Sequence, residues 1–475
     1  MKGGIHAMSP KLLSPLLLAT TLAGCAAVGP DYHAPATTAP AAWHAGMAGG
    51  LAADAVAPAS VTQWWRRFDD PVLSQLVEQS IAANPDVRSA QAALRQARAR
   101  RAIAGAALAP TVDVSASGSR RTPASGTGKE FYAAGFDAAW EPDVFGGARR
   151  GVEAAQADME ASAASLDATR VSLAAEAALN YVEARALQVR IGIARNNLES
   201  QNETWQLTDW RAQAGLVASL DVEQARANLA QTRAQVPALE RSLAEAQNRL
   251  AILMGEAPGS VNARLAGTAS IPAMPEQMAV GIPADALRNR PDIRAAERRV
   301  AAETARIGQA RAARYPGFSL SGSIGLESLT LNTLADGTVT RSFVASVAST
   351  IFDAGKREQQ VVAQDAVREQ AQIAYESTVL NALEEVENSL AAFARSKERQ
   401  TALLAAVNAA RNAALLARQR YASGLIDFQT VLDTGRTVLA LEDALAVAQA
   451  DGASSVVRLY KSLGGGWAPG ATSQQ

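Results

Sequence analysis

The sequence predicts a mainly α-helical chain that also contributes four β-strands to a barrel completed by other copies of itself. Three observations lead to this prediction. The chain contains two similar halves, each half holds a long proline-free helical segment, and each half holds two strand-like segments. By length alone, 475 residues suffice for two or three ordinary domains, but the internal repeat favours one long periodic fold.

Landmark residues of the first half return in the second half at a nearly constant offset. The run Asn84-Pro85-Asp86-Val87-Arg88 recurs as Arg290-Pro291-Asp292-Ile293-Arg294, 206 positions later, and Pro110 recurs as Pro316. The pair Gly215-Leu216 recurs as Gly424-Leu425, 209 positions later. Because the offset barely changes along the chain, a tandem duplication explains the pattern better than chance does.

Each half contains a long segment rich in residues of high helix propensity, at about Ala148 to Ala214 and Lys356 to Ala422. At 1.5 Å per residue, each helix would be on the order of 100 Å long. Between 220 and 253, apolar and small residues recur every seven positions, which predicts a coiled-coil seam. Pro237 lies inside this segment and predicts a kink or a break. On the helix pattern alone, a coiled-coil rod or spacer remains an alternative.

Four segments alternate apolar with polar or small residues, at about 111–119, 131–140, 318–326 and 342–352. Each is close to the ~9–11 residues that cross a bilayer as a tilted strand. Polar loops join the members of each pair, which predicts two hairpins. The alternative of soluble hairpins on a helical body remains open, because the alternation is diluted by alanine.

Four strands cannot close a barrel, since the smallest known transmembrane barrels have about eight. We therefore expect the chain to oligomerise. Two copies would supply roughly eight strands and an interior filled by side chains, whereas three would supply roughly twelve and begin to leave an aqueous lumen.

The first residues have the pattern of a bacterial lipoprotein signal peptide. Lys11 precedes an apolar run from Leu12 to Leu22, and Leu22-Ala23-Gly24-Cys25 forms a small-residue cleavage site that ends on the only cysteine. After cleavage, Cys25 would begin the mature protein and carry the acyl groups that anchor it to a membrane. No cofactor is expected other than this covalent lipid. Ala26 follows, and in bacterial lipoproteins the absence of Asp at that position implies the outer membrane.

The composition argues against an enzyme and against a nucleic-acid-binding protein. The 45 Lys and Arg residues nearly balance the 46 Asp and Glu residues, so there is no basic field to attract a phosphate backbone. The three histidines, His6, His33 and His44, all lie in the first tenth of the chain. The rest therefore has no imidazole for a catalytic triad or a histidine metal site. We expect neither catalytic residues nor a metal site.

Several motifs are specific when they occur together: Cys25-x-x-Val28-Gly29-Pro30-Asp31-Tyr32, Trp64-Trp65-x-x-Phe68-x-Asp70-Pro71, Pro85-Asp86 and Leu287-Arg288-Asn289-Arg290-Pro291-Asp292. This combination resembles the outer-membrane factor family, the TolC-like exit ducts of tripartite efflux pumps of the RND type. It resembles in particular their lipoprotein subgroup, which is NodT-like. The resemblance covers nearly everything from Cys25 to Gly466.

The resemblance implies a homotrimeric TolC-like fold, in which four strands per chain form a shared 12-stranded transmembrane barrel and long coiled-coil helices form a periplasmic α-barrel. The organisation that follows is 1–24 signal peptide, 25–70 lipid-anchored extended segment, 71–255 first repeat, 256–284 equatorial segment, 285–466 second repeat and 467–475 flexible tail. The helix–strand junctions then lie at Pro110, Pro316, Gly146, Gly147 and Gly355.

The resemblance also implies two kinds of site at the helix-turn-helix tips. Residues expected to contact a periplasmic adaptor are Gly215, Leu216, Val217, Ser219, Asp221, Gly424, Leu425 and Ile426. Residues expected at the periplasmic gate are Asp433, Asp427, Tyr421 and Thr430. Three copies of Asp433 would form a carboxylate ring that attracts cations and raises each carboxyl pKa. The alternative, that Asp427 and Asp433 lie on a solvated helix face, remains equally open.

The implied function is a passive exit duct for drugs or other small molecules. An inner-membrane RND-type transporter would deliver them through a periplasmic adaptor (membrane fusion) protein. The protein would reside in the bacterial outer membrane, lipid-anchored and extending into the periplasm. Two alternatives remain: an exit duct for type I secretion or for metal ions, and a structural lipoprotein that conducts nothing.

Replacing Asp433 with Ala is expected to raise the leak conductance of the isolated channel, because the carboxylate ring would be lost. The measurement is single-channel conductance and cation preference in planar bilayers. Unchanged values for both would remove Asp433 from the gate.

Overall fold

The computed structural model describes residues 27–36, 39–52, 62–122, 128–267 and 269–465. The predicted signal peptide, Cys25 and the predicted tail 467–475 lie outside them. The chain forms two compact units. The strand unit lies within Met1–Ala36, Ala93–Ala163 and Ala295–Glu376, and the helical unit within Thr37–Ala92, Ala164–Arg294 and Ser377–Gln475. Neither unit is one sequence repeat, because each long helix passes from one unit into the other.

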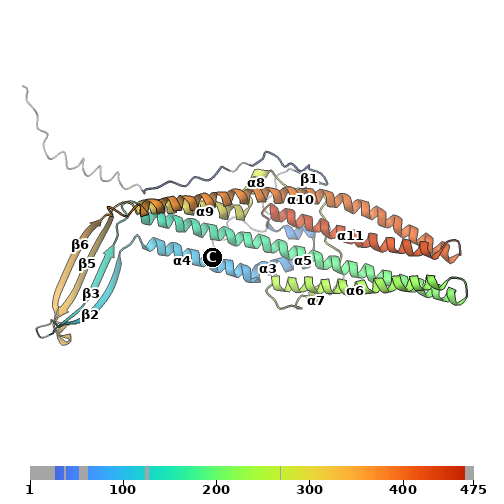
Figure 1. Cartoon of the computed structure of the whole chain (residues 1–475), viewed down its shortest axis with the longest axis horizontal. Helices are drawn as coiled ribbons and strands as arrows, with labels where there is room; N and C mark the ends of the chain where they lie inside the picture. Colours follow the sequence, from blue (N-terminus) through green and yellow to red (C-terminus); the bar gives the residue numbers. More distant parts are fainter. Residues whose placement is uncertain (1–26, 37–38, 53–61, 123–127, 268, 466–475) are drawn as a thin grey trace, which may run out of the picture. The chain divides into compact units, whose positions relative to one another are not determined.

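The two halves form equivalent elements in the same order (Figure 1). The first half has helices α3 (Pro71–Ala83) and α4 (Pro85–Ala106), strands β2 (Thr111–Arg121) and β3 (Lys129–Trp140), and helices α5 (Gly147–Gln213) and α6 (Ser219–Leu253). The second half has α8 (Pro283–Asn289), α9 (Pro291–Ala312), β5 (Gly317–Ser328), β6 (Thr338–Ala348), α10 (Lys356–Ala422) and α11 (Phe428–Ser462). Short elements are β1 (Leu51–Ala52), η1 (Trp64–Phe68), α7 (Asn262–Leu265), β4 (Met278–Ala279) and η2 (Leu331–Thr333).

The structure repeats as the sequence does, since three pairs of equivalent helices have equal lengths, although α3 has 13 residues and α8 has seven. Helices α4 and α9 have 22 residues each, α5 and α10 have 67, and α6 and α11 have 35. Proline marks several helix starts, because its missing N–H is not needed there. Pro71 opens α3, where the Asp70 carboxylate accepts hydrogen bonds from the N–H groups of Val72 and Leu73.

The strand unit contains a four-stranded antiparallel sheet with the order β2-β3-β5-β6. The two predicted hairpins are confirmed. The first three strands match their predicted bounds within two residues at each end. The prediction of the fourth strand over 342–352 is wrong, because β6 begins and ends four residues earlier, at Thr338 and Ala348.

The chain leaves the sheet after Ala348 because the residues that follow form the turn into α10. The Asp353 Oδ1 atom accepts a hydrogen bond from the Gly355 N–H at 3.0 Å. Ala354 and Gly355 have φ angles of 54° and 83°, which an extended strand cannot adopt. Ile351 and Phe352, expected in the strand, are instead 99% and 86% exposed.

The sheet has one apolar and one polar face, because side chains alternate along each strand and the register keeps like residues opposite one another. Val114 lies opposite Phe136, and Phe136 lies opposite Ile324 on the next strand. On the other face, the hydroxyls of Ser319 and Ser346 are 2.7 Å apart, as are those of Ser323 and Ser342. No described helix is sufficiently long and apolar to span a bilayer.

The helical unit contains two helix hairpins, α5–α6 and α10–α11 (Figure 1). The predicted seam of α6 is confirmed, since Leu229 and Leu250 are buried and its other members are buried or half-buried. Of the kink or break predicted at Pro237, the break is wrong, because α6 continues through this residue. Pro237 lies on the exposed side of the helix, where water can replace the hydrogen bond that proline removes.

The segment predicted as extended, 25–70, contains the short 3-10 helix η1, which packs on α11. Trp64 is fully buried, and its ring stacks on that of Tyr460 with centroids 5.5 Å apart. Arg67 donates a hydrogen bond to the Tyr460 hydroxyl at 3.0 Å. Burial of several aromatic rings therefore attaches the N-terminal segment to the last helix of the chain.

Residues 27–36 attach to α5 and α9 within the strand unit. The Arg150 guanidinium, 7% exposed, donates to the Asp31 carboxylate at 2.7 Å and holds the pKa of that carboxyl below its usual value. The Tyr32 hydroxyl donates to Glu297 at 2.8 Å, and burial raises the pKa of this phenol. These contacts bring the residues that follow Cys25 onto two helices.

Candidate functional site at the helical tips

Both helical tips turn by the same backbone geometry. Gly215 and Gly424 each have a φ angle of 73°, a left-handed conformation that favours glycine. The Leu216 N–H donates to the Arg211 carbonyl, and the Leu425 N–H donates to the Arg420 carbonyl, each at 2.9 Å. This is the Schellman arrangement, which ends a helix by satisfying its last carbonyl groups. The predicted tip glycines are therefore the residues at which each hairpin reverses.

The second helix of each hairpin begins differently. Asp427 caps α11, since its carboxylate accepts hydrogen bonds from the N–H of Thr430 at 2.9 Å and the hydroxyl of Thr430 at 2.5 Å. These bonds hold the pKa of the Asp427 carboxyl below its usual value. The equivalent residue before α6 is Ala218, which has no side-chain cap. Asp427 and Thr430 thus form a local helix start.

A buried cluster joins the two hairpins near the tips. Tyr421 is 5% exposed, and its ring centroid lies 5.5 Å from that of Phe428. The cluster comprises Ala225, Ala417, Tyr421, Phe428, Val431 and Leu432, with Trp205 and Ile426 packed against it. Because Ala225 and Trp205 come from α6 and α5, the contact is between hairpins.

Arg211 is a functional candidate that the sequence interpretation missed. Its two terminal nitrogens donate to the carbonyl oxygens of Tyr421 and Ala422, each at 3.0 Å. Its guanidinium carbon also lies 4.6 Å from the centroid of the Tyr421 ring, a cation–π contact. One side chain of α5 therefore binds the last turn of α10. An Arg in the final turn before a helix-ending glycine was an available signal, since such residues often bind terminal carbonyls.

Asp433 lies on an exposed face of α11, with its side chain 59% exposed. It accepts a hydrogen bond from the Gln429 amide at 3.1 Å and lies 3.8 Å from an Arg436 nitrogen. The structure therefore brings Tyr421, Asp427 and Thr430 to one tip and places Asp433 one turn further along the helix. Its proposed role in a carboxylate ring stays a prediction.

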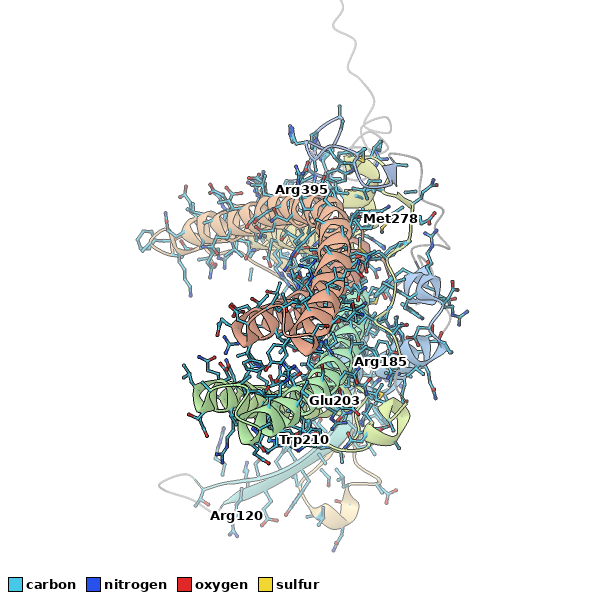
Figure 2. All side chains as sticks on the ribbon, turned by 90° about the vertical axis from the view of Figure 1, so that its right-hand side faces the viewer. Arg120, Arg185, Glu203, Trp210, Met278 and Arg395 are labelled. Atoms are coloured by element: carbon cyan, nitrogen blue, oxygen red, sulfur yellow. The ribbon has the colours of Figure 1, made fainter. Side chains whose placement is uncertain are left out.

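The predicted adaptor-contacting residues form two apolar tips. Leu216 and Leu425 are 71% and 73% exposed, whereas Val217, Asp221 and Ile426 are half-buried. Leu220 and Trp210, on the two helices that flank the first tip, are each 63% exposed. Figure 2 labels Trp210. Ser219 is exposed at the start of α6. Exposed apolar side chains at a turn are typical of a docking surface.

A cavity of about 730 Å³, lined by both polar and apolar side chains, lies among α5, α6 and α11. At its wall, Arg190 forms two hydrogen bonds with the Asp443 carboxylate, at 2.6 and 3.1 Å. Arg436 donates to the Asn228 side chain at 2.9 Å. Charged and amide groups therefore contribute to the contact between the hairpins here, beside apolar residues such as Leu239 and Leu439.

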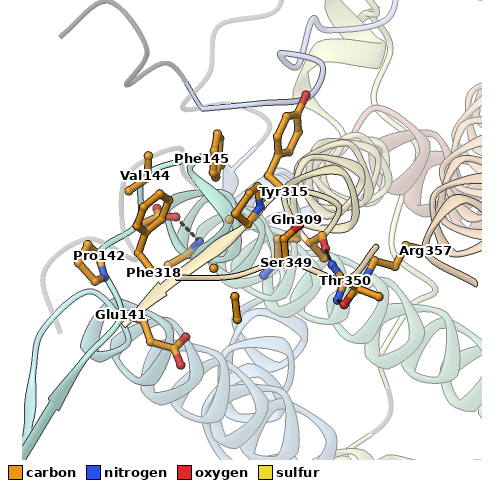
Figure 3. A pocket seen from close by; sticks show the side chains of 18 of the residues that line it. Glu141, Pro142, Val144, Phe145, Gln309, Tyr315, Phe318, Ser349, Thr350 and Arg357 are labelled. Carbon is orange, nitrogen blue, oxygen red and sulfur yellow. Dashed lines mark hydrogen bonds between the residues drawn. The ribbon is translucent and has the colours of Figure 1, made fainter. Parts of the chain in front are cut away.

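The predicted helix–strand junctions lie in the strand unit, where a hollow of about 650 Å³ is open between them (Figure 3). Pro110 and Pro316 directly precede β2 and β5, as expected. Gly147 is the first residue of α5, and Gly146 and Gly355 each directly precede a long helix with positive φ. Phe145 stacks on Tyr315 with ring centroids 4.6 Å apart.

Comparison with known proteins gives consistent matches along almost the whole chain. A family model described as outer membrane efflux protein matches residues 76–256 and 282–465. Nodulation protein T of Rhizobium leguminosarum bv. trifolii is 33% identical over 457 residues, which cover 94% of this chain and 96% of that protein. The antibiotic efflux pump outer membrane protein ArpC of Pseudomonas putida is 33% identical over 472 residues, which cover 97% of this chain and 96% of that protein.

Solved structures of similar fold include two outer-membrane channels. The OprN channel superimposes with a TM-score of 0.87 at 39% identity, covering 93% of this chain and 99% of that chain. The open state of the Neisseria gonorrhoeae MtrE channel has a TM-score of 0.81 at 28% identity, and the match covers 93% of this chain and 98% of that chain.

Replacing Arg211 with Ala is expected to loosen the contact between the tips, because both carbonyl bonds and the cation–π contact are lost. We expect hydrogen exchange of the backbone amides of residues 421–430 to accelerate about 10-fold or more. The matched control is Arg420→Ala, since Arg420 is the exposed counterpart in the second half. Equal exchange in both variants would show that Arg211 does not hold the tips together.

Proposed function

Because this chain belongs to the outer membrane efflux protein family, we propose that it is the outer-membrane exit duct of a tripartite efflux pump. Drugs or other small molecules leave through it passively, and the partner pump supplies the energy. The observation that carries this function is the match of the whole architecture, a two-faced sheet and paired 67-residue helices, to OprN over 93% of the chain. Relatives named as efflux pump outer membrane proteins support the same conclusion.

The working form that we propose is a homotrimer. Two features support it. Strands β2 and β6 are the two edges of the described sheet, and unpaired edge groups of this length invite pairing with another chain. The sheet also exposes both its apolar and its polar face, as expected where one face meets lipid and the other meets water.

We propose that the exposed tips receive a periplasmic adaptor, which connects the duct to an inner-membrane RND-type transporter. The supporting observation is the pair of exposed leucines, Leu216 and Leu425, at turns of equal geometry. On engagement, the bonds from Arg211 to α10 would break and the second hairpin would move away from the first. Such a step rearranges hydrogen bonds and makes no covalent bond, in keeping with a passive channel rather than an enzyme.

We propose that Cys25 carries a lipid anchor, and the first described residues after it lie near a helix–strand junction. Ala27 follows two residues later, and the Val28 N–H donates to the Phe145 carbonyl at 3.0 Å. The described part of the chain after Cys25 is thus held at the start of α5.

Deleting the gene in its native host is expected to raise susceptibility to drugs or solvents, and the wild-type gene should restore resistance. The purified protein should also conduct ions in planar bilayers. Impaired protein export with unchanged drug resistance would instead indicate a type I secretion duct, and raised sensitivity to metal ions alone would indicate a metal duct. Absence of conductance together with normal resistance would support a structural lipoprotein.

Replacing Cys25 with Ala is expected to abolish incorporation of labelled palmitate, because the acylated thiol is lost. The variant should still form trimers when a cleavable non-lipoprotein signal peptide is supplied, since strands and helices carry the assembly. The measurement is palmitate labelling together with native mass spectrometry. Full labelling of the variant would show that the lipid is attached elsewhere.

A further inference from the structure

The hollow of about 650 Å³ in the strand unit is a candidate binding site. It lies where β3 leads into α5 and where α9 leads into β5. Strands β3 and β5 are the two central strands of the described sheet, so most of the wall comes from the middle of the sheet. The volume is within the ~300–1,000 Å³ of typical sites for small organic molecules.

One side of the hollow is aromatic and faces the same way as the apolar face of the sheet. Phe145 stacks on Tyr315, and its ring centroid lies 6.3 Å from that of Phe318 (Figure 3). Phe318 lies six residues before Ile324 on an unbroken ladder, so both side chains are on the apolar face. The aromatic side therefore continues the face that meets lipid in the proposed duct.

Two arginines beside the aromatic side have no acidic partner in the described part of the chain. Arg311 and Arg314 are exposed, and neither forms an ion pair or a side-chain hydrogen bond with a described residue. Backbone hydrogen bonds continue the last turn of α9 as far as Tyr315. Arg311 therefore lies on the same side of this turn as Tyr315, which follows it by four residues.

The neighbouring charged groups do not cancel these two positive charges. Two other arginines at the junctions are each paired with a carboxylate, Arg149 with Asp143 and Arg357 with Asp353. Glu141 also lines the hollow, but Figure 3 shows it at the opposite end from the aromatic rings. Unpaired positive charge is therefore concentrated beside the aromatic side.

Termination of the helix does not explain the two arginines. Basic side chains stabilise the carbonyl end of a helix, and Arg311 lies in the last turn of α9. At an offset of 206, however, the equivalent residues of α4 are Gly105 and Leu108, and its last turn has no basic residue. Both helices still end five residues before their strands begin. The arginines are therefore not needed to end the helix.

We propose that this hollow binds one anionic phospholipid from the membrane leaflet at the base of the sheet. An acyl chain packs against Phe145, Tyr315 and Phe318, and the headgroup phosphate lies at Arg311 and Arg314. Guanidinium groups suit this task because they form charge-assisted hydrogen bonds with phosphate oxygens. Strand β5 begins two residues after Tyr315, so the arginines lie at the level of the headgroups. The inference rests on the proposed exit duct, which brings a membrane to this level.

Native mass spectrometry of the full-length protein tests the site. The protein is delipidated and incubated with phosphatidylglycerol or with phosphatidylcholine. We expect about one phosphatidylglycerol per chain to remain bound and far less phosphatidylcholine, because both lipids carry a phosphate but only the first has a net negative charge.

Removal of the two charges tests the headgroup contact. Arg311→Gln with Arg314→Gln is expected to lower retention of phosphatidylglycerol about 5-fold or more. The matched control is Arg233→Gln with Arg241→Gln, which removes two exposed arginines from α6 and should leave retention unchanged.

Filling the hollow tests the acyl-chain contact without a change of charge. Ala313 lines the hollow and is exposed, so Ala313→Trp places a large ring in the space without disturbing the core. Retention of phosphatidylglycerol should fall about as far as in the arginine variant. Ala234→Trp, at an exposed alanine of α6, should bind lipid as the wild type does, and circular dichroism checks that both variants fold.

Two results overturn the proposal. The first is retention of phosphatidylglycerol that neither the arginine variant nor Ala313→Trp lowers. The second is equal retention of both lipids that only Ala313→Trp lowers, which would show an apolar hollow without recognition of a headgroup.

Conductance of the same samples separates this inference from the proposed function. A wild-type protein that does not conduct in planar bilayers contradicts the exit duct itself. A wild-type protein that conducts but retains no phosphatidylglycerol contradicts only the lipid site.

Discussion

Helix α5 depends strongly on burial of alanine. Its buried residues include Ala157, Ala164, Ala174 and Ala178, interspersed with larger side chains such as Tyr181. Each buried methyl contributes little compared with the ~1.5–3 kcal/mol of a large aliphatic side chain. A helix of 67 residues with such a stripe gains its stability from packing rather than from propensity. It therefore needs close neighbours along its whole length, and the N-terminal segment, the equivalent helix and, in our proposal, other copies supply them.

The duplication gives both helical tips the same backbone turn but surrounds the two turns with different side chains. Both tips end in the same glycine turn, yet only the second has a capping Asp427 and a buried Tyr421, where the first has Ala218 and Ala212. The second tip is consequently anchored to α5 through Arg211, while both tips expose a leucine, Leu216 or Leu425. The second tip thus has a side-chain anchor on the first hairpin in addition to its exposed apolar residue.

The helix–strand junctions also differ between the two repeats. Phe145 stacks on Tyr315 at the first strand-to-helix junction, whereas Phe352 at the second is 86% exposed. Strands β2 and β6 are the two edges of the described sheet. In the homotrimer that we propose, pairing of these edges between copies would satisfy their free backbone groups.

The sequence by itself determined the elements whose signals are local. Glycines marked both tips, prolines marked helix starts, and the repeat predicted equal helices in both halves, because backbone conformation at these residues depends on their own chemistry. It placed the fourth strand four residues too late and allowed a break at Pro237, since hydrogen bonding in the turn after β6 and exposure of the helix face at Pro237 overrode the local pattern.

Only the tertiary structure decided the contacts between distant residues. Arg211 and Tyr421 are 210 positions apart, and Tyr32 reaches Glu297 across 265. Such partners depend on which faces of long helices meet, and periodicity alone does not specify that when the facing residues are mostly alanine.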